Sequence, residues 1–393
     1  MRIGIDYTAA ARQRAGIGRY TRELVSALLA LEGGAGSPHQ YVIFAATGGL
    51  KPETLRAEPQ AEAWNLKPGP GVRLRTVPLT DDWLARLWHR LRLPIPVETI
   101  MGLLDVFYSP DFVLPPTRRA TRTLLTVHDL SFLHCPEAFV PALRRYLERV
   151  VPRSIACADR VLADSAHTRS DIVSFLGVPP DKVEVLYSGV NARFRPEGEP
   201  RERERLQARY GIGYQPYVLS VGTLQPRKNY LRLIRAFANL KPGTPKPEPQ
   251  LVIAGGRGWL YEDILSEAAR HGDRVRILGF VDEGDLPALY RNAALFTLPS
   301  LYEGFGLPVL EAMACGVPVV CSNASSLPEV AGEAGLLVDP LDADGLTGAM
   351  RRVLEDSGLR REMIARGVAQ AARFTWERAA RQLLDVFDSL RRV

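Results

Sequence analysis

Short runs rich in β-branched and aromatic residues alternate with helix-length stretches along nearly all of the 393 residues. This alternation is typical of parallel strands that are joined by helices on the faces of a sheet. In the first half the expected strands are residues 2–6, 41–45, 72–78, 106–109, 123–128, 160–164 and 183–187. In the second half they are residues 217–221, 250–254, 275–278, 295–298, 318–321 and 335–338. The pattern therefore predicts an α/β protein with two parallel sheets.

A segment rich in proline, glycine and charge, residues 188–205, separates the two halves and reads as a linker. The chain is also longer than one hydrophobic core usually organises. We therefore expect two domains, residues 1–193 and 194–374. Residues 375–393 follow them as an amphipathic helix, with Thr375 as its N-cap.

The composition limits the location and the partners of the chain. The cysteines (Cys135, Cys157, Cys315 and Cys321) form no C-x-x-C pair and lie in apolar surroundings, so we expect buried, reduced thiols. No apolar run reaches the roughly 18 residues of a membrane span, and the chain begins directly with a strand pattern. A cytoplasmic location is expected. The net charge of +6 is spread over dispersed arginines, which argues against nucleic acid and suits a nucleoside diphosphate or an anionic membrane face.

Glu303 and Glu311 flank the start of a helix that is expected after the strand at residues 295–298. Pro308 suits the first turn of that helix and Gly316 suits its end. A glycine-bearing loop before a helix N-terminus offers unpaired N–H groups, which bind phosphate without a metal. The two carboxylates would then accept hydroxyl hydrogen bonds at either end of a diphosphate. The alternative is an ordinary pair of polar residues around a helix start.

Two adjacent cations, Arg227 and Lys228, follow the first strand of the second half together with Gly222. Arginine can fork onto two phosphate oxygens while lysine supplies a compact charge, so the pair suits a diphosphate. A solvated basic helix start is the other reading. Cations are disfavoured at a helix N-terminus, which favours a bound anion.

The first half carries weaker signals at the ends of its expected strands. Gly16 and Gly18 open a helix after the first strand, which turn or packing roles also explain. His128 ends a buried strand, where it is either a sugar contact or a structural hydrogen-bonder. Asp342 and Asp344 form a D-x-D that helix capping accounts for, and no His/Cys/carboxylate cluster has metal-ligand spacing, so no metal is expected.

The segments S-L-Y-E-G-F-G-L-P-V-L-E, Q-P-R-K-N and H-D-L-S-F together resemble glycosyltransferase family 4 over nearly the whole chain. The resemblance implies a GT-B fold, in which two Rossmann-like, doubly wound domains face a cleft and the terminal helix crosses back onto the first. It also implies that Glu303 contacts the donor sugar and Glu311 the nucleotide ribose. The backbone N–H groups that would approach the sugar and phosphates are those of Gly304, Phe305, Gly306 and Leu307.

The same resemblance gives roles to the weaker signals. Arg227 and Lys228 match the family's R-K-N element, and His128 would lie at the donor sugar. The backbone at Phe280 and Val281 would lie beside the nucleobase. The glycine loop would line the cleft, where its arginines (Arg12, Arg14 and Arg19) could meet an anionic acceptor. Ser165 and Thr168 resemble a cleft-edge pattern of the family, although helix capping by Ser165 explains it equally well.

The expected function is therefore a retaining, metal-independent glycosyltransferase without a cofactor. The segments G-I-G-R-Y-T, H-D-L-S-F and S-L-P-E-V-A-G look most like a mannosyltransferase branch that uses GDP-mannose on a glycan or lipid-linked acceptor. A UDP-sugar donor is the first alternative. A sugar-nucleotide epimerase and a silent sugar-nucleotide-binding scaffold are the others.

One amphipathic stretch stays outside this scheme. Trp83, Leu84, Leu87, Trp88 and Leu91 share one face of a helix-length segment with arginines interspersed. Such a segment can lie in a membrane interface, which would place the protein peripherally at the inner face of the cell membrane. It can equally pack on the sheet of the first domain with its arginines reaching solvent.

Overall fold

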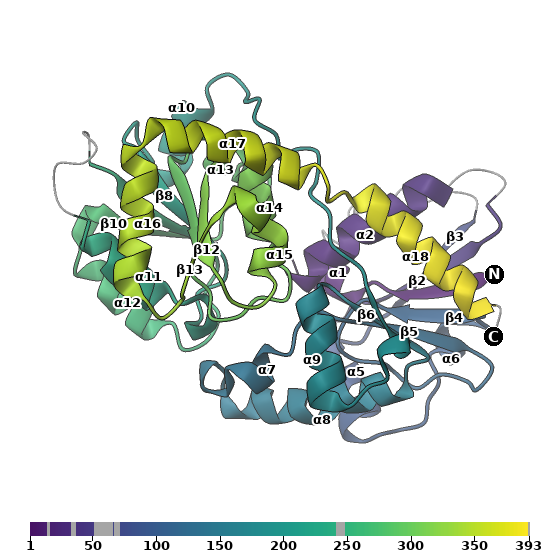
Figure 1. Ribbon diagram of the computed structural model, residues 1–393. Helices are drawn as coiled ribbons and strands as arrows, with labels where there is room; N and C mark the ends of the chain where they lie inside the picture. The colour runs from purple at the N-terminus through teal and green to yellow at the C-terminus, as the bar shows by residue number, and fades with distance from the viewer. Residues whose placement is uncertain (14–15, 33–36, 51–65, 67–70, 241–247, 392–393) are drawn as a thin grey trace. The chain divides into compact units, whose positions relative to one another are not determined.

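The computed structural model describes residues 1–13, 16–32, 37–50, 66, 71–240 and 248–391. Its internal contacts divide the chain into two units (Figure 1). Unit 1 contains Met1–Leu130, Arg145–Gly189 and Thr375–Val393, and unit 2 contains Ser131–Arg144 and Val190–Phe374. The division after Gly189 comes slightly earlier than the predicted one after residue 193. The prediction also missed that residues 131–144 belong with the second half.

Unit 1 is built on a sheet of seven parallel strands in the order β3-β2-β1-β4-β5-β6-β7. The strands are β1 (Arg2–Asp6), β2 (Gln40–Ala46), β3 (Val72–Val77), β4 (Val106–Ser109), β5 (Arg122–Val127), β6 (Arg160–Ala163) and β7 (Val183–Val185). All seven predicted strands are confirmed, with ends that differ by at most two residues. The sequence could locate them because central parallel strands are buried on both faces and read as continuous apolar runs.

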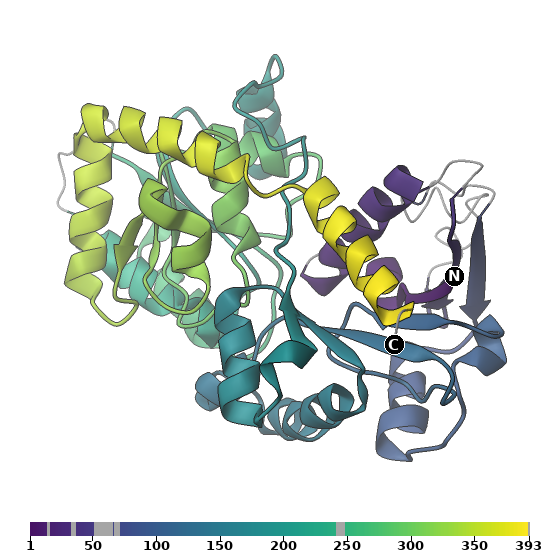
Figure 2. The ribbon, with the colours of Figure 1, turned by 45° about the vertical axis from the view of Figure 1, so that its right-hand side comes forward.

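Helices cover both faces of the unit 1 sheet. They are α1 (Thr8–Arg12), α2 (Ile17–Glu32), α5 (Asp81–Ala85), η1 (Arg86–Arg90), α6 (Glu98–Met101), α8 (Pro141–Cys157), α9 (Ala166–Leu176), η3 (Pro180–Lys182) and α18 (Trp376–Arg391). On one face α18 lies beside α2, and the ring of Phe387 meets that of Tyr108 at 6.0 Å (Figures 1 and 2). On the other face Phe44 packs against Trp88 of η1. Unit 1 is therefore completed by a segment, Thr375–Val393, that follows unit 2 in the chain.

Unit 2 is built on a sheet of six parallel strands in the order β10-β9-β8-β11-β12-β13. The strands are β8 (Tyr217–Val221), β9 (Gln250–Ala254), β10 (Val275–Gly279), β11 (Leu295–Leu298), β12 (Val319–Ser322) and β13 (Leu336–Val338). Each of the six predicted strands is confirmed to within one residue. Both sheets are thus parallel, as the alternation of strand and helix predicts.

Unit 2 has two separate cores, which lie on opposite faces of its sheet. The helices are α7 (Ser131–His134), η2 (Pro136–Ala138), α10 (Glu202–Tyr210), η4 (Pro226–Lys228), α11 (Tyr230–Ala238), α12 (Glu262–Ala269), η5 (Gly272–Arg274), α13 (Leu286–Arg291), α14 (Leu307–Ala314), α15 (Leu327–Ala331), η6 (Gly332–Ala334), α16 (Ala343–Glu355) and α17 (Ser357–Ala371). Side chains alternate between the faces of a strand, so Leu219 and Phe296 pack toward α10, α13, α14 and α15, whereas Val218 and Leu295 pack toward α11, α12 and α16.

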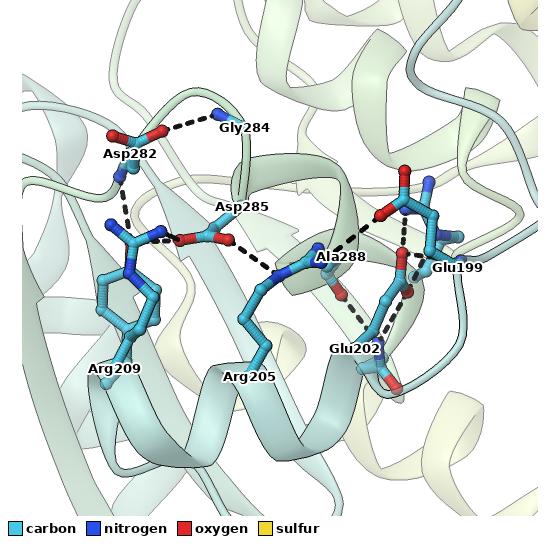
Figure 3. A network of polar contacts seen from close by, with 11 residues as sticks. Glu199, Glu202, Arg205, Arg209, Asp282, Gly284, Asp285 and Ala288 are labelled. Atoms are coloured by element: carbon cyan, nitrogen blue, oxygen red, sulfur yellow. Dashed lines mark hydrogen bonds and ion pairs between the residues drawn. The ribbon is translucent and has the colours of Figure 1, made fainter.

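The predicted linker at residues 188–205 is partly wrong, because its end is helical and it is packed on unit 2. Phe194 is buried in one of the two cores, and α10 begins at Glu202. Glu202 is 6% exposed and pairs with Arg291 of α13. Figure 3 shows this contact region, where Asp285 also forms ion pairs with Arg205 and Arg209 of α10. The charges that suggested a solvated linker are used for ion pairs between two helices.

Of two further expectations from the sequence, the first is wrong for one residue and the second is confirmed in part. Cys157 is exposed, whereas the other three thiols are buried, because it is the last residue of α8. The apolar face at residues 83–91 is divided: Leu84 and Trp88 are buried on the sheet, while Trp83 and Leu91 are 52% and 65% exposed. Among the helices that the structure describes, none has the length and apolar character needed to cross a membrane.

Candidate functional site

The first candidate site lies where β11 runs into α14 at the carboxyl edge of the unit 2 sheet. Open α/β sheets bind ligands at this edge. Gly306 precedes α14 with a φ of 110°, and a Cβ atom there would come within 2.6 Å of the Leu327 side chain. Only glycine fits this position. Pro308 lies in the first turn of the helix, and Gly316 has a φ of 71° just after its end. The predicted strand, loop and helix start are therefore confirmed.

Glu303, in this loop, is the centre of a buried charge cluster. Its side-chain Oε1 accepts from Lys228 Nζ at 2.5 Å and from Ser300 Oγ at 2.6 Å, and Oε2 accepts from Arg227 Nη1 at 3.0 Å. The residue is 6% exposed. Although burial raises its pKa, the charges of Lys228 and Arg227 lower it to about 2. Glu303 is therefore ionised throughout the physiological range.

The two cations reach Glu303 because of the turn that follows β8. Arg227 and Lys228 end the short helix η4, and Asn229 after them takes a left-handed conformation with φ of 59°. Its side-chain amide donates to the carbonyl oxygens of Pro299 and Pro340. The Leu301 N–H donates to the Arg227 carbonyl, which ties this turn to the loop that carries Glu303. Three residues that were predicted to bind the donor thus lie together, and both cations contact the Glu303 carboxylate.

Glycine at position 222 leaves room for the lysine. A Cβ atom at Gly222 would lie 3.0 Å from Lys228 Cε and from the Tyr230 hydroxyl. Its φ of 156° is near the limit of extended backbone, so the close approach of the side chains is the main constraint. Gly222 therefore contributes to the site by the absence of a side chain.

The remaining residues that were predicted to bind the donor differ in how far their side chains are exposed. Phe305 and Val281 are buried in a core of unit 2, so only their backbone groups can reach a ligand. Phe280 is 49% exposed. Glu311 lies in the second turn of α14 and is 2% exposed, and Leu307 is the first residue of that helix. Gly304 lies between Glu303 and Phe305 in the loop.

Three serines support the loop, and the sequence analysis missed their role. Ser326 Oγ lies within donating distance of two carbonyl oxygens, those of Glu303 and Phe305, at 2.9 and 2.8 Å. The Glu303 N–H donates to Ser325 Oγ at 2.8 Å, and Ser300 contacts the Glu303 carboxylate. Ser326 is the first residue of the S-L-P-E-V-A-G segment, which contributed to the family resemblance. The sequence alone offers no reason to expect that this serine supports the loop.

A second candidate site lies at the carboxyl edge of the unit 1 sheet. His128 follows β5, and its Nδ1 lies 2.7 Å from Oδ2 of Asp164, which follows β6. Its Nε2 lies 3.0 Å from the carbonyl oxygen of Pro110. Although burial lowers the pKa of His128, the Asp164 and Asp111 carboxylates raise it to about 9. The predicted sugar contact is thus a buried histidine whose two ring nitrogens face a carboxylate and a carbonyl oxygen.

Three carboxylates that the sequence did not single out lie at this edge of the sheet. Asp6, Asp111 and Asp164 follow or end β1, β4 and β6, which with β5 are consecutive in the sheet. Burial raises the pKa of Asp6 to about 6 and also raises those of Asp111 and Asp164. Their position at strand ends was the available signal, but it gains meaning only once the strand order is known.

Gly16, Gly18 and Ser165 of unit 1 have roles in the local backbone structure. Gly16 has a φ of 58°, and a Cβ atom at Gly18 would lie 2.2 Å from the Gln13 carbonyl oxygen. Both positions therefore need glycine. Ser165 caps α9 by accepting from the Thr168 N–H, as the alternative reading predicted.

The structure gives positions for most of the other side chains that the sequence singled out. Arg12 pairs with Asp81 at 3.0 Å, Arg19 lies in α2, and Arg14 is outside the described residues. Asp342 caps α16 by accepting from the Gly345 N–H. Among the described residues, no group of three or more His, Cys, Asp and Glu side chains could hold a metal ion.

Comparison with known proteins assigns both halves of the chain. The family model "Glycosyltransferase Family 4" matches residues 14–194, and "Glycosyl transferases group 1" matches residues 202–370. The O-antigen chain mannosyltransferase B of Escherichia coli is 39% identical over 288 residues, which are 72% of this chain and 74% of that protein. The serotype-specific mannosyltransferase WbdA of Escherichia coli is 31% identical over 70% of this chain, but the match spans only 34% of WbdA.

A solved structure supports the same fold. Anabaena Alr3699/HepE, in complex with UDP and glucose, has a TM-score of 0.73 and 19% identity, with coverage of 99% of this chain and 100% of that chain. At this identity the likeness concerns the fold. The relatives, the family models and the two parallel sheets all indicate the same family and the same fold. The chain therefore belongs to glycosyltransferase family 4 and is a glycosyltransferase with the GT-B fold.

Proposed function

We propose that this glycosyltransferase is a retaining, metal-independent enzyme that moves mannose from GDP-mannose to a glycan or lipid-linked acceptor. The buried cluster of Glu303, Arg227 and Lys228 beside the start of α14 carries the proposal. Two cations and a helix N-terminus suit a diphosphate and its developing negative charge. The choice of mannose is supported by the relatives named as mannosyltransferases.

The proposed reaction needs no protein base. The acceptor hydroxyl oxygen forms a bond to the anomeric carbon on the face from which the nucleoside diphosphate departs. The bond between that carbon and the phosphate oxygen breaks, and the acceptor proton passes to the leaving phosphate oxygen. Arg227 and Lys228 stabilise the leaving group, while Glu303 accepts a hydrogen bond from a sugar hydroxyl. Because two protein cations serve the phosphates, a divalent metal is not required.

A binding panel tests the donor and the metal together. Thermal shift and calorimetry would compare GDP, UDP, ADP and their common sugar conjugates, with and without a chelator. Selective GDP-mannose binding that survives chelation is the expected result. Selective UDP binding, the main alternative, would replace the donor assignment, and binding that chelation abolishes would refute metal independence.

Turnover separates the other candidate functions. Loss of GDP-mannose without any acceptor would indicate an epimerase or hydrolase. Binding without turnover under any acceptor would indicate a silent scaffold. Transfer with retention should give a product whose anomeric configuration matches that of the donor, which NMR of the product reads directly. An inverted product would refute the retaining mechanism.

We further propose that the exposed part of residues 83–91 contacts an anionic membrane face at the site where a lipid-linked acceptor is used. Trp83 and Leu91 are exposed, and the Arg86 guanidinium lies over the Trp83 ring at 5.1 Å. Exposed aromatic and aliphatic side chains with arginines are typical of interfacial contact. Anionic vesicles should bind the wild type and release Trp83→Ala/Leu91→Ala. Leu341→Ala, at an exposed leucine of unit 2, is the control. Equal binding of all three proteins would contradict the assignment.

A further inference from the structure

Asp164 is a buried carboxylate that the proposed reaction does not use. It directly follows β6, is 5% exposed and places Oδ2 2.7 Å from His128 Nδ1. Its other oxygen, Oδ1, is buried without a hydrogen-bond partner among the described residues. A buried carboxylate is unfavourable unless an opposite charge compensates it. The only such group in contact with it among the described side chains is the ring of His128.

The second ring nitrogen of His128 defines the protonation of the ring. Nε2 lies 3.0 Å from the carbonyl oxygen of Pro110, which can only accept a hydrogen bond, so Nε2 carries a hydrogen. The proton between Nδ1 and Asp164 belongs to the weaker acid. The ordinary pKa of imidazolium, about 6.5, exceeds that of aspartic acid, about 3.9. Burial lowers the pKa of His128 and raises that of Asp164, but the Asp164 and Asp111 carboxylates raise the pKa of His128 to about 9, so the ring keeps this proton. Both ring nitrogens therefore donate, and His128 is an imidazolium.

The groups packed around the ring favour the same state. Asp111, after β4, adds a second negative charge, and Asp129 lies next in sequence to His128. The rings of Tyr20 from α2 and Phe112 meet the His128 ring edge-on at 4.8 and 5.4 Å. Tyr108 of β4 is also near Tyr20 and Asp164, and burial raises its pKa, so it stays neutral. The histidine is thus fixed by two hydrogen bonds and two aromatic rings.

We propose that Asp164 is the positioning residue for His128: it holds the ring as a doubly donating imidazolium, so that His128 supplies a fixed positive charge and accepts no proton from the acceptor. The role in transfer rests on the proposed function, whereas the state of the ring does not. With both nitrogens occupied, His128 has no lone pair for a general base. The acceptor proton then passes to the leaving phosphate oxygen as the new glycosidic bond forms and the old one breaks.

The ring itself can be titrated by NMR in the full-length protein. The His128 signals are those that His128→Gln removes from the set of six histidines. The wild type is expected to titrate at about pH 9, and Asp164→Asn should lower that value by about 1 to 3 units. Asp164→Glu should restore it in part. A titration of wild-type His128 near pH 6.5 would overturn the proposal, and this test does not depend on any Asp164 variant being folded. An unchanged value in Asp164→Asn would also overturn it.

The pH dependence of transfer tests the positioning role. Wild-type activity should show no titration of His128 between pH 6 and 8, because the ring stays charged in that range. Asp164→Asn should keep more activity at pH 6 than at pH 8, since its ring loses the proton in between. An equal loss at every pH would indicate a merely structural role and overturn the proposal.

A second histidine–aspartate pair provides the control. His167 and Asp171 lie in α9, with Nε2 3.5 Å from Oδ2, and Asp171 is as deeply buried as Asp164. Asp171→Asn should leave both the His128 titration and the pH profile unchanged, and changes like those of Asp164→Asn would overturn the proposal. A wild type that transfers no sugar would contradict the proposed function alone, because the titration still supports or overturns the assignment of Asp164.

Discussion

One carboxylate, Glu303, determines the charge balance of the unit 2 site. It contacts both Arg227 and Lys228, the cations that the proposed function assigns to the diphosphate. A bound diphosphate would therefore share or replace the contacts that Glu303 makes with the two cations. The carboxylate both preorganises the cations and competes with the phosphate for them.

Glu303→Gln is expected to reduce transfer by about 10²- to 10³-fold while leaving nucleoside diphosphate binding intact or tighter by up to about tenfold. The amide keeps the size of the side chain but removes the anion that the two cations share. Turnover and calorimetry with GDP measure the two effects separately. Glu311→Ala should instead weaken binding of the nucleotide. Exposed Glu355→Gln is the control, and equal losses of binding and turnover in Glu303→Gln would refute the division of roles.

The same carboxylate should make stability depend on pH. The pKa of Glu303 in the native state is about 2, below the ordinary value of 4.5 that applies to the unfolded chain. Its contribution, about 3 kcal/mol, is therefore fully present above pH 4.5 and is lost as the pH falls toward 2. Urea unfolding between pH 7 and 3 should show a shallower decline for Glu303→Gln than for the wild type. Parallel curves would contradict this assignment.

Contacts between single side chains were the part of the site that the sequence could not provide. Glu303, Arg227, Lys228 and His128 were found because each belongs to a motif or follows an apolar run. Asp164 was not assigned a role, because its partner lies 36 residues away and the pairing depends on β5 and β6 being neighbours. A pattern of apolar runs locates the strands but does not give their order.

The helix α10 shows how a helix rich in charged residues can be missed when it lacks an apolar face. Its first residues, 202–205, are a run of Glu and Arg without apolar periodicity at the end of the segment that the sequence predicts to be a linker. The helix is docked on α13 through Asp285, which is 3% exposed and accepts from the Tyr210 hydroxyl at 2.8 Å (Figure 3). Arg205 Nε lies 3.0 Å from the same carboxylate. Tertiary ion pairs thus replace the apolar face that usually reveals a helix.

Asp285→Asn should lower the free energy of unfolding by about 1 to 3 kcal/mol. The value is below that for a fully buried pair, because Arg205 and Arg209 are 34% and 51% exposed. Chemical denaturation provides the measurement. Asp282→Asn is the matched control, since Asp282 is exposed and, among the described residues, its side chain accepts only from the Gly284 N–H, as an asparagine could also do. Indistinguishable variants would mean that Asp285 does not dock α10.

The terminal helix α18 can be tested in the same way. Phe387 is fully buried against Tyr108, so Phe387→Ala should lower the free energy of unfolding by about 3 to 5 kcal/mol. Arg391→Ala, at the exposed end of the same helix, should change it by less than about 0.5 kcal/mol. A small effect of Phe387→Ala would show that α18 is not part of the unit 1 core.

The chain as a whole passes between the two units several times, which the sequence pattern did not reveal. Residues 131–144 belong to unit 2, where the His134 ring stacks on Tyr302 at 4.8 Å and Trp259 Nε1 donates to the Ala138 carbonyl at 2.6 Å. Tyr302 directly precedes Glu303. The segment is therefore linked to the loop of the candidate donor site.

Hydrogen exchange should reveal this link in the intact protein. A bound nucleoside diphosphate is expected to slow amide exchange in residues 131–138 together with residues 299–311, because the stacked rings join the two segments. Residues 145–157, which belong to unit 1, provide the internal control. Slower exchange at 299–311 without any change at 131–138 would contradict the coupling. His134→Ala should weaken the effect if the stacked pair carries it.

The chain passes between the units at residues 189/190 and again at 374/375, and these two points lie side by side in space although they are far apart in the sequence. The Val190 N–H donates to the Phe374 carbonyl, and Gly189 is so close to Trp376 that a Cβ atom would lie 2.1 Å from its nitrogen. Any attempt to graft the nucleotide-binding half of a relative onto this protein must respect that geometry. A chimera joined only at residues 189/190 and 374/375 would leave residues 131–144 facing a foreign surface. The transplant has to carry that short segment with it.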